Sequence, residues 1–269
     1  MMPFTIGTTS YIIPEPNDNL IANVRFLVGK VKRIQLLFFG KDYLAELMSA
    51  DIIERLTEIR AASRMEYSVH LPIDYDLMNE RTDVSRAADH IAHIVDVMKV
   101  VGVNDFILHV DRSENFKYPE VALTEANRRR IEAVLDAVDA AVDPKHVFIE
   151  NVGFDLTYFA AAIAKRGHPI CMDLGHLYRF GHSMDAFVDT FGSAIQEVHL
   201  HGIIDGKDHR AFPGDGAVDA ARVMGFLRAY RGSVIIEVFN EIDLNDTLMY
   251  LNNPQLPDQC SSVKKNSRT

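Results

Sequence analysis

Short apolar runs alternate with longer amphipathic segments from one end of the chain to the other. Eight of the short runs are rich in β-branched and aromatic residues and show no polar alternation, which is typical of parallel strands covered on both faces. These predicted strands are FTIGTT (4–9), RIQLLFF (33–39), EYSVHL (66–71), DFILHV (105–110), HVFIEN (146–151), PICMDL (169–174), QEVHLH (196–201) and SVIIEVF (233–239).

Segments with helical spacing separate several of these strands. The clearest cover residues 42–62, 83–101, 123–142 and 219–230. Asp83 and Thr124 are suitable N-cap residues, and Gly102 and Gly232 lie where helices are expected to stop. Alternation of eight strands with helices in one chain favours a closed barrel over a doubly wound sheet. We therefore predict an α/β protein built as a single (β/α)₈ TIM barrel.

The chain length fits one barrel with a short extension. With 269 residues, 48% of them hydrophobic, the chain can bury a large core. We assign residues 1–253 to the barrel and residues 254–269 to a polar C-terminal tail, because PQLPDQCSSVKKNSRT follows the last predicted helix and contains few apolar residues.

Charge and composition narrow the classes of partner. A net charge of −10 and a pI near 5.5 argue against a protein that grips many DNA phosphates. The two cysteines are too few for a disulfide framework, and no apolar run approaches the ~18 residues of a membrane span. The N-terminus lacks a basic region followed by an apolar run. These features predict a cytoplasmic protein that binds neither nucleic acid nor a membrane.

Acidic and imidazole side chains stand where the predicted strands end, which is where (β/α)₈ barrels carry their active sites. Six consecutive strands and the loop after the seventh contribute them, and the set is His70, His109, Glu150, Asp173, His176, His199, His201, Asp208, His209 and Glu237. Crowded carboxylates repel one another and lose hydration, a cost that bound cations remove. Imidazole and carboxylate ligands suit zinc, manganese or iron. We therefore predict a divalent metal site with zinc as the favoured ion.

The order His, His, Glu, Asp-x-x-His, His, His, Glu resembles the xylose isomerase-like barrels and, within them, the endonuclease IV group, over nearly the whole chain. The resemblance implies three zinc ions, with Glu150 bridging two of them. By position, the implied ligand sets are His70, His109 and Glu150; Glu150, Asp173, His199 and Glu237; and His176, Asp208 and His209. Gly-Asp-Gly at 214–216 also matches this group. This chain departs from the Asp-x-His that is usual in the group, because Asp208 directly precedes His209.

The number of ligands separates hydrolases from isomerases in this superfamily. A one-metal isomerase or epimerase needs a set such as Glu150, Asp173, His199 and Glu237, and the remaining histidines would be superfluous. Phosphodiester hydrolysis benefits from several ions. We therefore expect two or three ions per chain and a metal-dependent phosphodiesterase, with Glu150 and Glu237 as catalytic residues. Alternatives are a one-metal sugar isomerase or epimerase, an abasic-site DNA endonuclease, and a corrinoid-binding barrel without catalysis.

The N-terminal GTTSYIIP, followed by NVRFL and RIQLLFF, is similar to the opening of the cobamide remodelling phosphodiesterases. That resemblance implies cleavage of the nucleotide loop of a cobamide such as cobalamin, giving cobinamide phosphate and a riboside of the lower base. Gln35 and Gly40 depart from acidic positions associated with that second strand. Five residues are predicted to face the substrate, namely Thr8, Thr9, Ser10, His201 and Arg210. A polar turn is the alternative for the first three.

Overall fold

All eight predicted strands are present, and they close into a parallel barrel in the order β1-β10-β7-β6-β5-β4-β3-β2. The computed structural model describes residues 2–13, 19–38, 40, 44–110 and 124–252. The barrel strands are β1 (Thr5–Thr9), β2 (Arg33–Leu37), β3 (Glu66–His70), β4 (Phe106–His109), β5 (Val147–Glu150), β6 (Ile170–Asp173), β7 (Ile195–Leu200) and β10 (Ser233–Ile236). The prediction of a single (β/α)₈ TIM barrel is confirmed.

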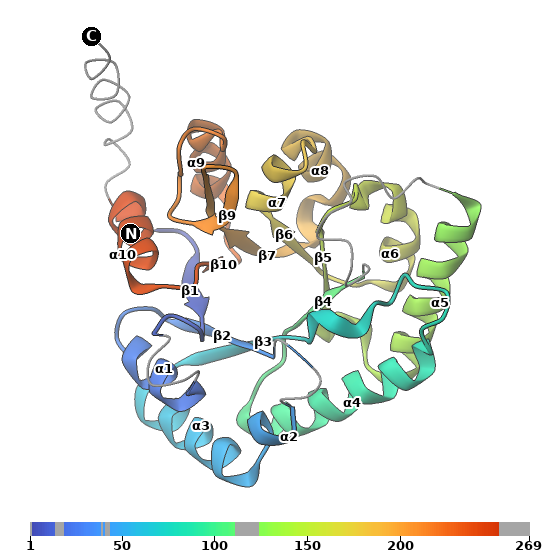
Figure 1. Cartoon of the computed structure of the whole chain (residues 1–269), viewed down its shortest axis with the longest axis horizontal. Helices are drawn as coiled ribbons and strands as arrows, with labels where there is room; N and C mark the ends of the chain where they lie inside the picture. Colours follow the sequence, from blue (N-terminus) through green and yellow to red (C-terminus); the bar gives the residue numbers. More distant parts are fainter. Residues whose placement is uncertain (1, 14–18, 39, 41–43, 111–123, 253–269) are drawn as a thin grey trace.

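Helices surround the strands on the outside of the barrel (Figure 1). The α-helices are α1 (Leu20–Leu27), α2 (Leu44–Leu47), α3 (Ala50–Ser63), α4 (Val84–Val101), α5 (Glu125–Ala141), α6 (Ala160–Arg166), α7 (Leu174–Arg179), α8 (Met184–Phe191), α9 (Ala220–Ala229) and α10 (Glu241–Asn252). Short 3₁₀ turns are η2 (Ile73–Tyr75), η4 (Pro144–His146), η5 (Leu156–Phe159) and η6 (Gly192–Ala194). The pattern did not single out α1, α6, α7 and α8, because helices of six to eight residues carry too few apolar repeats to show a period.

The predicted helix ends depend on local hydrogen bonds. The Asp83 carboxylate accepts from the amides of Ser85 and Arg86 at the start of α4, and α4 ends at Gly102, whose φ is 87°. The Thr124 hydroxyl caps α5 in the same way. The segment predicted over 42–62 is divided into α2 and α3, because Ser49 between them is extended. Helix α9 ends at Ala229, before Gly232, since Tyr230 is already extended.

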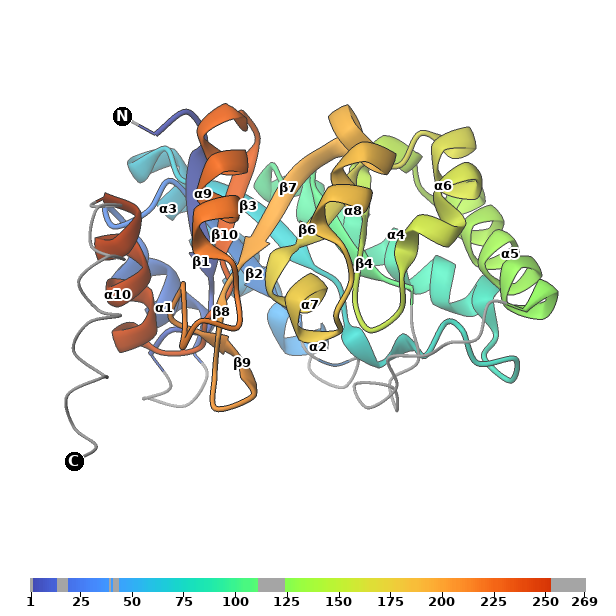
Figure 2. The ribbon, with the colours of Figure 1, turned by 90° about the horizontal axis from the view of Figure 1, so that it is seen from above.

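An antiparallel hairpin of β8 (Gly202–Ile204) and β9 (Lys207–Arg210) follows β7 and is absent from the sequence-based prediction. In Figure 2 this hairpin lies on the same side of the barrel as α7 and α2, at the carboxyl ends of the strands. The hairpin therefore brings its side chains, including His209, over the mouth of the barrel.

The interior of the barrel has two levels. Ile107, Phe148 and Cys171 form a small apolar cluster separate from the main core between strands and helices. Each stands two residues before a predicted ligand, so it shares that ligand's face of the strand at a lower level. The predicted ligands therefore form the upper level, at the mouth.

Among the described residues, no helix combines the length and apolarity that crossing a membrane requires. The predicted tail, residues 254–269, lies outside the described residues.

Candidate metal centre

Three overlapping groups of potential ligands lie at the carboxyl ends of the strands. Within each group the ligand atoms lie within 4.8 Å of one another. The groups are His70, His109 and Glu150; Glu150, Asp173, His199 and Glu237; and Asp173, His176, His201 and His209. A fourth combination, Glu150, Cys171 and His199, includes a thiol from the level below. The structure thus brings together eight of the nine predicted metal ligands and adds His201. Glu150 belongs to the first two groups and Asp173 to the last two.

Glu150, at the end of β5, is the centre of the first two groups. One carboxylate oxygen lies 3.3 Å from Nε2 of His70 and 3.0 Å from Nε2 of His109, and the other lies 3.0 Å from Nδ1 of His199. Burial alone would raise the pKa of Glu150, but His199 and His109 outweigh it and hold the pKa well below its usual value. The carboxylate is therefore ionised and faces imidazole nitrogens on two sides.

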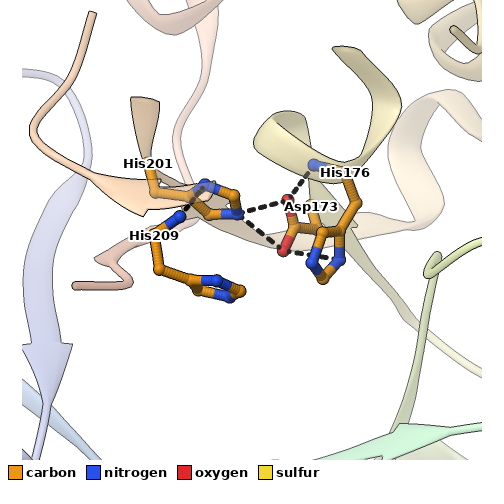
Figure 3. A group of neighbouring side chains, drawn as sticks. All are labelled: Asp173, His176, His201 and His209. Atoms are coloured by element: carbon orange, nitrogen blue, oxygen red, sulfur yellow. Dashed lines mark hydrogen bonds and ion pairs between the residues drawn. The ribbon is translucent and has the colours of Figure 1, made fainter. Parts of the chain in front are cut away.

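Asp173 is the centre of the third group (Figure 3). It caps α7, because its Oδ1 accepts from the amide of His176 over 2.7 Å, and Nδ1 of His176 lies 3.1 Å from its Oδ2. Nε2 of His201 lies 3.1 and 3.3 Å from the two carboxylate oxygens. The D-L-G-H sequence at the end of β6 therefore places a carboxylate and an imidazole at one point through a single turn of helix.

The backbone assigns the ring proton of neutral His201. The amide of His209 lies 3.0 Å from Nδ1 of His201 and can only donate, whereas the Gly202 carbonyl, which can only accept, lies 3.3 Å from the same nitrogen. The shorter contact favours the neutral tautomer with its proton on Nε2, the nitrogen that faces Asp173 (Figure 3). His201 therefore holds the carboxylate rather than facing substrate, and it is fully buried. The predicted substrate contact at His201 stays a prediction, which its burial and its pairing with Asp173 do not favour.

His209 reaches the site from the hairpin strand β9 with a strained backbone. Its φ of 52° lies in the left-handed region, which is unfavourable for a side chain with a β-carbon. Nδ1 lies 3.3 Å from the Asp208 carboxylate and Nε2 lies 3.6 Å from Glu237. Burial opposes the charged ring, but Glu237 and Asp208 outweigh it and raise the pKa of His209 to about 10. Asp208 therefore contacts His209 and, at 3.7 Å, Arg179, and belongs to none of the three groups.

The donor set fits divalent cations. Oε2 of Glu237 and Nδ1 of His176 are buried, and neither makes a hydrogen bond among the described residues. Buried polar atoms normally have partners, so two such atoms facing other carboxylates and imidazoles fit the binding of a cation. Imidazole nitrogen and carboxylate oxygen are ligands of zinc and related metals.

The three hydroxyl residues predicted to face the substrate make hydrogen bonds within the fold. The Thr8 and Thr9 hydroxyls are fully buried and donate to the carbonyls of Ile236 and Val238, over 2.7 and 2.9 Å. Ser10 accepts from the amide of Leu37. These three hydroxyls tie β1 to its two neighbouring segments, and their contact with a substrate stays a prediction.

Arg210, the last of the predicted substrate-binding residues, makes an ion pair within the fold. Its Nε donates to the Asp243 carboxylate over 2.8 Å, which joins the end of β9 to α10. Its side chain is 39% exposed, so this ion pair is a surface contact between two elements.

Sequence reasoning missed the residues that support the ligands. The Asn151 side chain makes two hydrogen bonds to the backbone of Asp173, over 2.8 and 2.9 Å, and so fixes the end of β6 against β5. Below His199, Gln35 and Glu197 are both fully buried. A usable signal exists for Glu197, because it is a charged residue in an apolar run and shares its strand face with His199.

A cavity of about 170 Å³ opens onto the three groups. Its walls combine four imidazoles and Glu237 with apolar side chains, and the lining residues are Leu37, Phe38, His70, Ile73, His109, His176, His209, Glu237 and Phe239. The described lining contains no Lys or Arg. This volume admits the reacting part of a substrate and leaves any larger part outside.

The fold and this site define a (β/α)₈-barrel protein with a candidate multinuclear metal centre. The chain belongs to the xylose isomerase-like TIM barrel family, which matches residues 31–259. No curated protein matches the chain at a significant level.

Several solved structures share the fold. Endonuclease IV from Thermus thermophilus is 18% identical, with a TM-score of 0.64 over 92% of this chain and 99% of that one. The 3-keto-D-glucoside 4-epimerase YcjR from E. coli is also 18% identical, with a TM-score of 0.66 over 93% and 99%. The IOLI protein with a bound zinc atom is 13% identical, with a TM-score of 0.69 over 94% and 96%. At these identities the likeness shows the fold alone.

Proposed function

We propose that the protein is a metal-dependent phosphodiesterase acting on a small-molecule phosphodiester. The observation that carries this proposal is the sharing of Glu150 between the His70–His109 pair and the group around His199. Hydrolases with two metal ions hold them about 3.5–4 Å apart, where one carboxylate reaches both. A single-ion site has no use for the imidazoles of His70 and His109 beside the same carboxylate.

In this proposal the ions and the side chains would have different roles. Divalent ions held by the three groups would supply a nucleophile from water at neutral pH and neutralise the charge of phosphate oxygens. Glu150 and Glu237 would hold those ions as ionised carboxylates, since the pKa of each is well below its usual value despite burial. His199 and His109 lower the pKa of Glu150. His199 and His209 lower the pKa of Glu237. The apolar cavity wall would exclude bulk water and so strengthen these interactions.

The finer proposal is that the substrate is a cobamide, cut in its nucleotide loop to give cobinamide phosphate and a riboside of the lower base. The N-terminal similarity to the cobamide remodelling phosphodiesterases supports it, as does the cavity. A small cavity with partly apolar walls and no Lys or Arg in its described lining suits one phosphodiester joined to a flat apolar group. The same lining and a net charge of −10 disfavour an abasic DNA duplex, whose binding relies on cations that meet many phosphates.

The test is incubation of the zinc-loaded protein with a complete cobamide, followed by product masses. We expect cobinamide phosphate and the riboside. Glu150→Gln removes the shared charge and should reduce turnover to below about 1% of the wild type, since loss of even a supporting residue costs about 10–100-fold. Glu241→Gln, at a surface glutamate with 46% side-chain exposure, is the matched control and should leave turnover intact. Unchanged turnover in Glu150→Gln would contradict the role of Glu150.

A one-metal isomerase or epimerase is the second candidate. The group of Glu150, Asp173, His199 and Glu237 is a four-ligand set by itself, and Nδ1 of His199 lies 3.0 and 3.1 Å from the two glutamates. Elemental analysis separates the candidates, because one ion per chain favours isomerisation and two or three favour hydrolysis. Tight binding of a cobamide that stays intact would instead indicate a corrinoid-binding barrel without catalysis.

A further inference from the structure

Below the metal centre, a buried network of charged and amide groups crosses the barrel from β2 to β7. Glu197 has no solvent exposure, and one of its carboxylate oxygens accepts from Gln35 over 2.7 Å. The other accepts from Arg33 over 3.2 Å. We call these three residues the Arg33–Glu197–Gln35 network. A carboxylate this deeply buried is costly unless it has a specific use.

The two ring nitrogens of His199 face different partners. Nδ1 points to the mouth of the barrel, 3.0 Å from Glu150 and 3.1 Å from Glu237. Nε2 points down into the network, 3.0 Å from the amide nitrogen of Gln35 and 3.6 Å from Oε1 of Glu197. Nδ1 is therefore the nitrogen that meets a cation, and Nε2 is the one that the network controls.

A cation on Nδ1 requires the proton of the neutral ring to stand on Nε2, where it needs an acceptor. The amide nitrogen of Gln35 is a donor and cannot serve. Rotating the Gln35 amide would bring its oxygen to Nε2, but that oxygen would then lie 2.7 Å from the Glu197 carboxylate and be repelled by it. Two acceptors then remain among the described residues. The thiol of Cys171 also contacts His199, but burial raises its pKa well above the usual value, so it is neutral and a weak acceptor. Glu197 is the stronger acceptor, and a shift of about half an ångström would close its 3.6 Å gap.

We propose that Glu197 is a positioning residue that accepts the Nε2 proton of His199 and thereby holds the ring in the metal-binding tautomer. Arg33 keeps Glu197 in place and compensates its charge, and it does so while also pairing with Asp105 over 2.8 Å. This inference rests on the proposed metal binding, and it concerns a residue that lies outside all three groups of potential ligands.

The first test compares zinc affinity, measured by competition with a chromophoric chelator, in the wild type and in Glu197→Gln. The variant keeps the shape but loses the charge, so we expect zinc to bind about 10–100-fold more weakly, with Glu197→Asp recovering part of the loss. Asp105→Asn is the matched control, because it removes another partner of Arg33 without touching His199. Its zinc affinity should equal that of the wild type. Equal affinity in Glu197→Gln and the wild type would overturn the inference.

A second measurement is made on the wild-type protein, and a variant serves only to assign the signal. In zinc-loaded wild-type protein with ¹⁵N-labelled histidine, the Nε2 proton of His199 should give a hydrogen-bonded ring N–H signal, assigned by its loss in His199→Gln. A zinc-loaded wild type whose His199 carries no proton on Nε2 would overturn the inference and leave the proposed function standing. A wild type that binds no divalent metal would overturn both.

Discussion

The imidazole ring of His201 packs directly against the α-carbon of Gly175, so that a methyl group at Gly175 would overlap the ring. Gly175 is the third residue of D-L-G-H and lies within α7, where glycine is otherwise unfavourable. The close approach explains why glycine stands there: it lets His201 reach Asp173 from β7.

Gly175→Ala should therefore displace His201 and release the Asp173 carboxylate. We expect at least about tenfold weaker binding of one metal ion, in line with other losses of ligand support. Metal stoichiometry after dialysis against a weak chelator checks this. Gly225→Ala is the control, because a methyl group there meets nothing within 4 Å and should stabilise α9 by up to about 1 kcal/mol. Equal metal content in the two variants would argue against the positioning of Asp173 by His201.

Metal binding should strengthen with rising pH because of His209. Its pKa of about 10 means that the metal-free protein holds a proton that an ion must displace. Affinity for zinc should rise between pH 6.5 and 10 by up to about tenfold per pH unit for this proton. Isothermal titration across this range, with proton release measured in two buffers, checks it. Asp208→Asn removes one cause of the raised pKa, so the rise should end at lower pH. A pH-independent affinity would refute the assignment.

The same proton affects stability when no metal is bound. A histidine with a raised pKa stabilises the fold fully below its unfolded value of about 6.5, and this contribution is lost as the pH rises through about 10. Metal-free wild type should therefore lose more stability between pH 7 and 10 than His209→Gln does. Urea unfolding at both pH values gives the difference, and equal losses in both proteins would contradict it.

Thr9→Val should affect the fold and leave catalysis alone. The hydroxyl of Thr9 donates to the buried carbonyl of Val238, and its loss removes a hydrogen bond from that carbonyl. We expect the free energy of unfolding to fall by about 1–3 kcal/mol, with KM unchanged. If instead KM rises while stability is kept, the hydroxyl contacts the substrate, as the sequence alone suggested.

Phe239 should contribute to substrate binding through the cavity wall. Its ring stacks on His209, with centroids 5.0 Å apart and planes 25° apart, and it lines the cavity. Phe239→Ala should raise KM about 2–10-fold for a substrate with an aromatic base, which corresponds to the ~0.5–1.5 kcal/mol of an aromatic contact. Phe239→Tyr keeps the ring and is the control. A KM unchanged in Phe239→Ala would place the base outside this wall.

The amino-acid sequence by itself determined the barrel and the residues at its mouth. Buried strands and helix caps are local patterns, so eight apolar runs and caps such as Asp83 were readable without any contact information. The position of His70 or Glu150 at a strand end follows from the same local pattern, because all strand ends of a parallel barrel meet at one rim.

Only the tertiary structure decided which partners each polar side chain contacts. Thr8, Thr9 and Arg210 stand near the rim in the sequence, yet partners far along the chain bind their polar groups. The sequence does not distinguish the two ring nitrogens of His199, whereas in the barrel Nδ1 faces the carboxylates at the mouth and Nε2 faces Glu197. Hydrogen-bond partners and ring orientation depend on residues distant in sequence, and no local pattern encodes them.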